Sequence, residues 1–190
     1  MPEHICPPWI GWALASPIRK VFYNPQGILM PYIRQGMTVL EPGPGMGFFT
    51  LELARLVGAT GRVVAIDVQK EMIDRLRRRV ERSGLTEHVE LRLADTKGMH
   101  IEDLALKVNF IFAFAMAHEV PDKSRFFNEL FAASALNCRL LISEPAWHVG
   151  EVDFGHTIDV AQGAGFSLES RPIIKSNRSA LLTKYASRRQ

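Results

Sequence analysis

Cysteines are scarce in this sequence, and their scarcity bears on the compartment in which the protein works. Only Cys6 and Cys138 occur among 190 residues, and no CxxC spacing is present. A disulfide framework needs several cysteines at short spacings. We therefore expect free thiols in a reducing, cytoplasmic setting, and we predict no metal ligands.

Long apolar runs are also missing, and we expect no leader peptide. A membrane-spanning helix needs about 20 predominantly apolar residues, whereas the longest run, residues 109–117 (NFIFAFAMA), has the length of a buried strand. Residues 1–20 contain prolines where a signal peptide has its apolar stretch, and an acid in place of a basic cluster. We expect a soluble protein without membrane insertion.

Neither sign of charge dominates the chain. There are 23 Lys and Arg residues against 20 Asp and Glu residues, which gives a net charge of +3. This bias is too small to indicate a nucleic-acid partner, and the basic run at residues 75–82 (RLRRRVER) is more typical of a solvated helix face. A hydrophobic content of 47% is sufficient for the core of one globular domain.

The chain divides into two parts by composition. Residues 1–36 are rich in proline and aromatic residues, which predicts short helical pieces that form a lid. Residues 37–190 show regular alternation of strands and helices, which predicts the main domain. We predict strands at 38–41, 61–68, 88–95, 109–115, 139–145, 166–174 and 179–186, and helices at 47–58, 69–84, 122–134 and 154–165.

This alternation predicts an α/β fold. Strands separated by helices of about 10–15 residues form βαβ units with right-handed crossovers, and therefore an open, doubly wound, mostly parallel sheet. Only residues 175–178 (KSNR) separate the last two strands. This connection is too short for a parallel crossover, so the last strand should run antiparallel to its neighbour.

A glycine-rich loop follows the first predicted strand, in residues 39–50 (VLEPGPGMGFFT). Ligands of doubly wound sheets bind outside the carboxyl ends of the strands. Gly43, Gly45 and Gly47 permit a tight turn and let a ligand approach the backbone. A plain strand-to-helix turn would need only one glycine, so the loop favours a small-molecule site.

The acid before this loop indicates the charge of the ligand. A dinucleotide fingerprint has the spacing GxGxxG, whereas this loop has GxGxG with Phe48 at the position of the last glycine. Glu41 would repel a pyrophosphate but attract a cation. A sulfonium that also carries an ammonium group meets this requirement.

These features resemble the class I S-adenosylmethionine-dependent methyltransferases. The resemblance rests on residues 39–50 together with 63–73 (VVAIDVQKEMI), 91–96 (LRLADT) and 140–145 (LLISEP), and it spans residues 38–185. It implies a Rossmann-like sheet of seven strands, mostly parallel, with an antiparallel last strand. It also implies S-adenosylmethionine as the cofactor and S-adenosylhomocysteine as the product.

The resemblance assigns roles to residues at the first two strand ends. Glu41 matches the acid near the ammonium group of the methionine moiety, usually reached partly through water. Gly43, Gly45 and Gly47 would line that moiety and the ribose. Asp67 matches the acid that accepts hydrogen bonds from both ribose hydroxyls, although an acid after a strand can also cap the next helix.

Further roles follow for the next two strand ends. Val68 would flank the adenine face, and Asp95 matches the residue that accepts from the adenine amino group. The segment around Asp95 (ADTKG) is also a plausible turn. Phe114 and Ala115 would pass under the methionine portion of the cofactor.

His118 is the candidate catalytic residue. It lies in the segment after the fourth strand, which usually faces the acceptor in this family, and could be a base or an acceptor-binding group. A packed or helix-capping role is the alternative. Glu119 could provide a second polar contact or be an ordinary acid before the next helix.

The acceptor itself is predicted only as a class. No NPPY or DPPY tetrapeptide follows the fourth strand, which favours a small molecule over nucleic acid. An arsenic acceptor would need several cysteines, and only Cys6 and Cys138 are available. We therefore expect a methyltransferase for a small molecule. The alternatives are a non-catalytic S-adenosylmethionine-binding module and an NAD-binding oxidoreductase, and the oligomeric state is not predicted.

Overall fold

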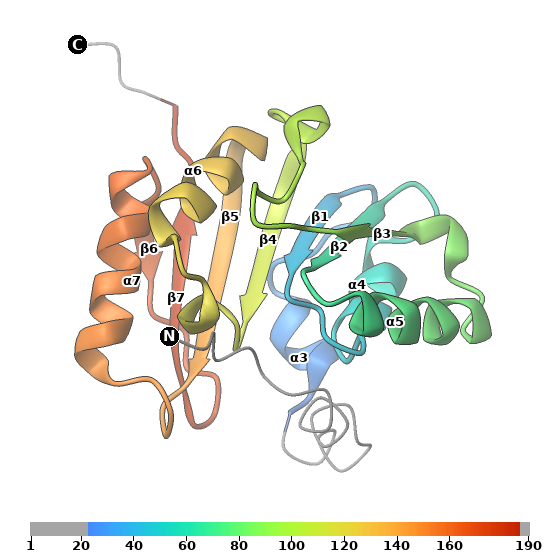
Figure 1. Ribbon diagram of the computed structural model, residues 1–190, viewed down its shortest axis with the longest axis horizontal. Coiled ribbons are helices and arrows are strands. Elements are labelled where there is room, and N and C mark those ends of the chain that lie inside the picture. The colour runs from blue at the N-terminus through green and yellow to red at the C-terminus, as the bar shows by residue number, and fades with distance from the viewer. Residues whose placement is uncertain (1–22, 187–190) are drawn as a thin grey trace. The chain divides into compact units, whose positions relative to one another are not determined.

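The computed structural model describes residues 23–186 (Figure 1). The chain divides into two compact units, residues 1–96 and 97–190. Its seven strands belong to one sheet, to which the first unit contributes β3-β2-β1 and the second unit β4-β5-β7-β6. The predicted α/β fold with a seven-stranded, mostly parallel sheet is confirmed.

The first unit is a parallel sheet with helical connections. Its main elements are α3 (Pro25–Leu29), β1 (Thr38–Pro42), α4 (Thr50–Val57), β2 (Arg62–Asp67), α5 (Lys70–Arg82) and β3 (Val89–Leu93). β1 and β3 each pair with β2 in parallel, with Glu41 opposite Ala65 and Asp67 opposite Leu93. This register brings the carboxyl ends of all three strands to one edge of the unit.

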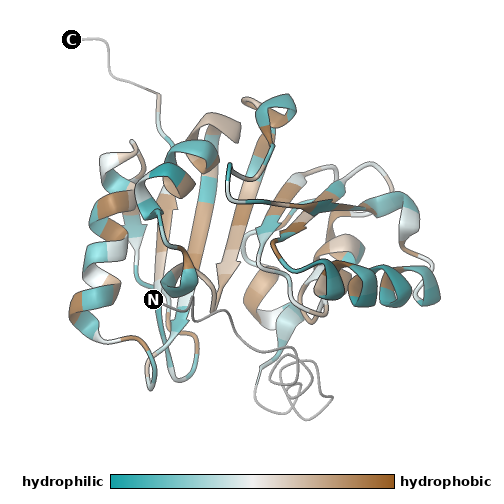
Figure 2. Cartoon of the chain, in the orientation of Figure 1, coloured by the Kyte–Doolittle hydropathy of each residue, from teal (hydrophilic) through white to brown (hydrophobic). Residues whose placement is uncertain are grey.

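The helices of this unit form where the sequence predicts them. α5 buries one apolar stripe, which comprises Met72, Ile73, Leu76 and Val80. α4 ends at Gly58, which has a positive φ of 66°, as a helix-terminating glycine requires. Figure 2 shows α5 mostly in hydrophilic colours, as expected for a helix with one narrow apolar stripe.

Two ion pairs lie along α5. Glu71 pairs with Arg75 across one helical turn. Asp74 pairs with Lys70, at 2.5 Å. Lys70 lies one turn earlier on the same face, so Asp74 has a suitable cation in both directions.

The second unit contains the antiparallel end of the sheet. Its main elements are β4 (Val108–Phe114), α6 (Lys123–Ala133), β5 (Ser134–Pro145), α7 (Glu151–Gly163), β6 (Ser167–Ser170) and β7 (Asn177–Thr183), with a 3-10 turn η3 at Ala117–Glu119. β4 and β5 pair in parallel, whereas β7 runs antiparallel to both β5 and β6. The predicted antiparallel last strand is confirmed.

The structure describes only part of the predicted lid. Residues 1–22, including Cys6, lie outside the described residues. Residues 23–36 contain α3, whose Leu29 is fully buried, and Ile33, which is 5% exposed. The division into a lid at 1–36 and a domain at 37–190 stays a prediction. Within residues 23–186, no helix has the length and apolar character needed to cross a membrane.

Candidate functional site

The glycine-rich loop leaves β1 in a tight turn. Gly43, Gly45 and Gly47 all have positive φ angles, of 65°, 54° and 79°, a region that other residues adopt only at a cost. A Cβ at Gly45 would meet no atom within 4 Å, whereas one at Gly47 would lie 2.2 Å from Leu76 Cδ1. Gly45 therefore presents bare backbone to open space, and Gly47 allows α5 to pack against the loop.

Glu41 is a buried acid at the end of β1. Its side chain is only 3% exposed, and burial raises its pKa to about 8. The neighbouring Thr50 hydroxyl lowers this pKa somewhat, but it does not form a well-oriented hydrogen bond. Among residues 23–186, neither Glu41 Oε2 nor Thr50 Oγ1 has a hydrogen-bond partner.

An unpartnered buried carboxyl oxygen is costly for folding. Native proteins keep such groups mainly where a function requires them. The edge of the sheet where Glu41 lies is also where ligands of doubly wound sheets bind. Glu41 is therefore suited to receive a cationic donor from a ligand.

Asp67 ends β2 and connects the second strand to the glycine-rich loop. Burial raises its pKa, while hydrogen bonds from the backbones of Gln69, Gly45 and Val68 oppose this rise. The bond from Gln69 N to Asp67 Oδ1 measures 2.9 Å. Asp67 thus stabilises the turn before α5, but the N-cap of that helix is Gln69.

The two residues predicted around the adenine lie at the same edge as Asp67. Val68 follows β2 and is 58% exposed, which is unusual for a valine beside a strand end. Asp95 is exposed and follows Ala94, whose N–H donates to the Asp67 carbonyl at 2.9 Å. Their contacts with a cofactor stay predictions.

One arginine of the basic run has a role that sequence reasoning missed. Arg79 is partly buried and donates to the Met46 carbonyl, in the middle of the glycine-rich loop. Burial lowers its pKa, and Arg75 approaches Met46 Sδ at 3.9 Å. The interpretation of residues 75–82 as a wholly solvated face is therefore corrected, and the i,i+4 spacing of these arginines was the available signal.

The second unit places Phe114 and Ala115 at the end of β4. Phe114 is 8% exposed. Ala115 has a φ of 54°, a left-handed conformation that is uncommon for alanine, and its N–H donates to the Ser143 carbonyl at 2.8 Å. This bend ends the strand and directs the chain into η3.

His118 and Glu144 form a hydrogen-bonded pair in this unit. His118 Nδ1 lies 2.7 Å from Glu144 Oε2, and the Ala117 N–H donates to Glu144 Oε1, also at 2.7 Å. Glu144, at the end of β5, is 1% exposed. Both of its oxygens therefore orient η3, and Nδ1 donates, which leaves Nε2 as the free ring nitrogen.

The surroundings of His118 favour its charged form. Burial alone lowers the pKa of His118, but the hydrogen bond and charge of Glu144, with the charge of Glu119, raise it above its ordinary value. Glu119 Oε1 lies 3.7 Å from Nε2, too far for a hydrogen bond. The His148 ring contacts His118 edge to face, with centroids 4.8 Å apart.

Glu144 is the second functional candidate that sequence reasoning missed. The sequence contained a signal, because apolar β1 and β5 both end in an acid followed by proline, at Glu41-Pro42 and Glu144-Pro145. An acid at the carboxyl end of a buried strand has few structural reasons to be there. The same reasoning that selected Glu41 would therefore have selected Glu144.

Comparisons with known proteins agree with this geometry. A family model described as a methyltransferase domain matches residues 33–168. An arsenite methyltransferase from Halobacterium salinarum is 31% identical over 109 residues, which cover 57% of this chain and 27% of the relative. The ubiquinone/menaquinone biosynthesis C-methyltransferase UbiE of Escherichia coli is 30% identical over 112 residues, covering 59% and 44%. The chain thus spans less than half the length of these curated relatives.

Solved structures show the same fold. A SAM-dependent methyltransferase from Aquifex aeolicus matches with a TM-score of 0.84 at 25% identity, covering 95% of this chain and all of the other. A putative S-adenosyl-L-methionine-dependent methyltransferase from Methanococcus maripaludis matches over the full length of both chains with a TM-score of 0.77 at 14% identity, which supports the fold alone. Since the family model covers most of the chain, this protein belongs to the S-adenosylmethionine-dependent methyltransferase family.

Proposed function

We propose that this protein transfers a methyl group from S-adenosylmethionine to a small organic acceptor. The observation that carries the proposal is the buried Glu41 carboxyl, whose Oε2 has no hydrogen-bond partner within residues 23–186. A cofactor with an ammonium group supplies that partner. When bound, S-adenosylmethionine provides an activated methyl group on its sulfonium.

The residues of the first unit fit this cofactor. Glu41 would accept from the ammonium group, and the open backbone at Gly45 would let the ligand approach closely. Asp67 Oδ1 already accepts from Gln69 N, but a carboxylate has about four acceptor positions and can still receive two ribose hydroxyls. Exposed Val68 would cover the adenine face, with Asp95 at its amino group.

The two alternative functions make different demands on these residues. In an NAD-binding oxidoreductase a pyrophosphate would lie near the glycine-rich loop, where Glu41 would repel it. A non-catalytic S-adenosylmethionine-binding module would have no need of an oriented histidine. The hydrogen-bonded pair of His118 and Glu144 therefore favours an enzyme.

We propose that His118 Nε2 contacts the acceptor and accepts its proton when the nucleophile arrives protonated. Glu144 is then a positioning residue, because it holds Nδ1 and fixes the tautomer in which Nε2 is the acceptor. His118 acts as a base only after losing its own proton. Because its pKa is raised, turnover should increase as the pH passes upward through that value.

Variants of this pair test the assignment. His118→Ala should lower turnover by about 100-fold or more, a usual range for a lost general base, with little change in cofactor affinity. Glu144→Gln keeps one acceptor oxygen, for either the Ala117 N–H or His118 Nδ1, and removes the charge that raises the pKa of His118. The acidic limb of its pH–rate profile should move to lower pH, and Glu119→Gln should move it less. An unchanged profile in Glu144→Gln would contradict the proposed role.

The acceptor is proposed to be organic and not a metalloid. Cys138 is buried on β5, and burial raises its pKa to about 11, so it is not a thiolate near neutral pH. Cys6 lies outside the described residues. We also propose a cytoplasmic protein that does not act on nucleic acid, based on the two isolated cysteines and the small net charge.

Calorimetry and product detection together test the proposed function. The full chain should bind S-adenosylhomocysteine, and should bind NAD far more weakly. Incubation with S-adenosylmethionine and a pool of cellular metabolites should release S-adenosylhomocysteine. Tighter binding of NAD would refute the methyltransferase function, and cofactor binding without turnover would favour the non-catalytic module.

A further inference from the structure

A hollow of about 420 Å³ lies in the second unit, between the start of α6 and α7. Residues 120–124 line one side, and His156 and Val160 of α7 line the other. The lining combines apolar side chains with the Lys123 ammonium, the Ser124 hydroxyl and the His156 imidazole. This combination fits a ligand with an apolar body and a polar, hydrogen-bond-accepting end.

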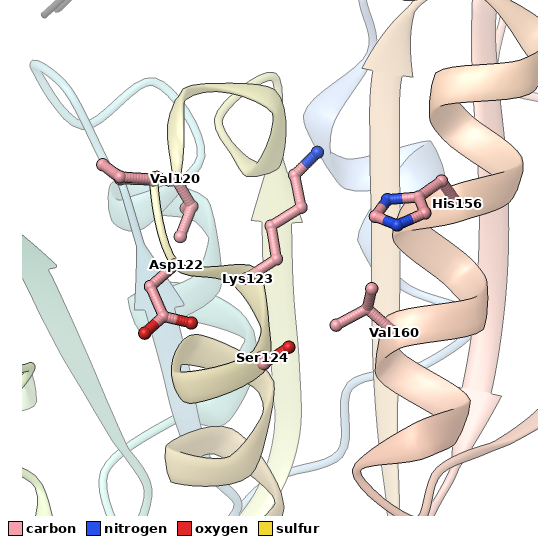
Figure 3. A pocket seen from close by; sticks show the side chains of 7 residues that line it. Val120, Asp122, Lys123, Ser124, His156 and Val160 are labelled. Carbon is pink, nitrogen blue, oxygen red and sulfur yellow. The ribbon is translucent and has the colours of Figure 1, made fainter.

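The polar groups of this hollow face the same space. Figure 3 shows Lys123 and Ser124 directed from α6 toward the side of α7, where His156 and Val160 point back. Asp122, the only acid in the lining, projects on the other side of α6. Its carboxylate is also occupied as the cap of α6, since it accepts from Arg125 N at 2.9 Å. Asp122 and Lys123 therefore point to different sides and form no ion pair.

Within the described part of the chain, no carboxylate forms an ion pair with Lys123. Lys123 is only partly exposed, and its Nζ donates to no acceptor within residues 23–186. Its charge nevertheless reaches His118, whose pKa it lowers. Lys123 is therefore within electrostatic reach of His118, and Val120, which also lines the hollow, directly follows the turn η3 that carries His118.

We propose that this hollow binds the oxyanion of an organic acid, and that the methyl acceptor is such an acid. Lys123 pairs with the carboxylate or phosphate, while Ser124 and His156 donate hydrogen bonds to it. Val120, together with Val160, contacts the apolar body. The identification of the ligand as the acceptor rests on the proposed methyl transfer, whereas the anion site itself does not.

Binding of simple anions tests the site without any turnover. Benzoate and phenyl phosphate, titrated separately into ¹⁵N-labelled full-length protein, should shift the amide resonances of Val120, of residues 122–124 and of residues 156–160. The probe that binds with the higher affinity shows whether the site prefers a carboxylate or a phosphate. Lys123→Met should weaken this binding by about fivefold or more, as expected for a lost charge-assisted contact.

Lys107→Met is the matched control. Lys107 precedes β4, and its Nζ donates to the Asp103 carbonyl. His118 follows the other end of that strand. This variant removes the same charge from the same unit and should bind both probes as the parent does. Shifts elsewhere in the chain, or equal binding by Lys123→Met, would overturn the anion site.

A second experiment separates this inference from the proposed function. The metabolite pool is divided on an anion-exchange resin, and both fractions are tested for release of S-adenosylhomocysteine. Turnover confined to the acidic fraction and lost in Lys123→Met supports the acidic acceptor. Turnover with the neutral fraction alone overturns it but leaves methyl transfer intact. Turnover with neither fraction refutes methyl transfer, and the benzoate titration then decides the anion site by itself.

Discussion

Cofactor binding should release a proton from Glu41. Burial raises the pKa of this carboxyl to about 8 in the free protein, so about nine tenths of it is protonated at pH 7. An opposite charge close by lowers a carboxyl pKa by about 1–3 units. A reduction of about 2 units by the incoming ammonium would ionise Glu41 and release roughly 0.8 proton at pH 7.

The ligand contributes little to this count. Its ammonium belongs to a free amino acid, whose adjacent carboxylate makes it more basic than a chain-terminal α-amino group of pKa about 7.7–8.0, so it is already protonated at pH 7. The net release should therefore stay at about 0.8 proton. Ionising Glu41 at pH 7 costs about 1.4 kcal/mol, which offsets much of the 1.5–3 kcal/mol of a typical charge-assisted bond. Affinity should consequently rise between pH 6 and pH 8.

Calorimetry in two buffers measures this proton directly. S-adenosylhomocysteine is titrated at pH 7 in phosphate and in Tris, whose ionisation enthalpies differ, and the difference in heat gives the number of protons released. Glu41→Gln should show no release and should bind up to about tenfold more weakly near pH 8. Glu52→Gln, which changes a surface acid of α4 paired with Arg55, should behave as the parent does. Equal proton counts for the parent and Glu41→Gln would refute the placement of the ammonium at Glu41.

The same carboxyl should affect stability in the absence of cofactor. Its pKa is higher in the folded protein than the ordinary value of 4.5, so folding favours the protonated form. The free energy of unfolding that this pKa difference contributes is fully present below pH 4.5. It decreases by about 1.4 kcal/mol per pH unit as the pH rises toward 8. Urea unfolding of the parent should follow this decrease between pH 5 and 8, and Glu41→Gln should reduce its slope.

Three further changes test other parts of the structure. Asp67→Ala should weaken S-adenosylhomocysteine binding at least about tenfold in calorimetry, because charge-assisted bonds to both ribose hydroxyls are lost, and Asp67→Asn should be intermediate. If Asp67→Ala bound within about twofold of the parent, the role of Asp67 would be only to stabilise the turn before α5. Gly47→Ala should lower the melting temperature more than Gly45→Ala, since only the former places a Cβ against α5; equal losses would exclude that clash. Deletion of residues 1–22 spares buried Leu29, so it should leave the fold intact. If the segment is a lid, the deletion should impair turnover. Unchanged binding and turnover would exclude the lid.

Much of this protein is determined by local features of its sequence. The apolar run of β2 is buried from Val63 onward, because a parallel strand is covered on both faces. The four-residue connection after the predicted sixth strand allows only an antiparallel hairpin, which β6 and β7 form. Glu41 and Asp67 could be selected in advance because they are acids at the ends of such strands.

Element boundaries were less well predicted, because they depend on neighbours in space. β5 begins at Ser134, directly after α6, although the sequence predicted a strand only from residue 139. The added residues include Asn137, which has a φ of 61° and whose N–H donates to the Lys184 carbonyl beyond β7. The irregular start of β5 is stabilised by hydrogen bonds to the neighbouring segment of the chain and leaves no periodic pattern in the sequence.

Only the tertiary structure decided which side chains act together. His118 and Glu144 are 26 positions apart and lie on a short turn and a strand end, and only the parallel pairing of β4 with β5 brings them within 2.7 Å. Arg79 likewise belongs to a basic run that the sequence pattern predicts to be solvated, yet the turn of α5 directs it to the loop carbonyl of Met46. Sequence patterns report burial and backbone preference, residue by residue. Hydrogen bonds between distant residues depend on how strands pair and helices turn, and this is a property of the folded chain.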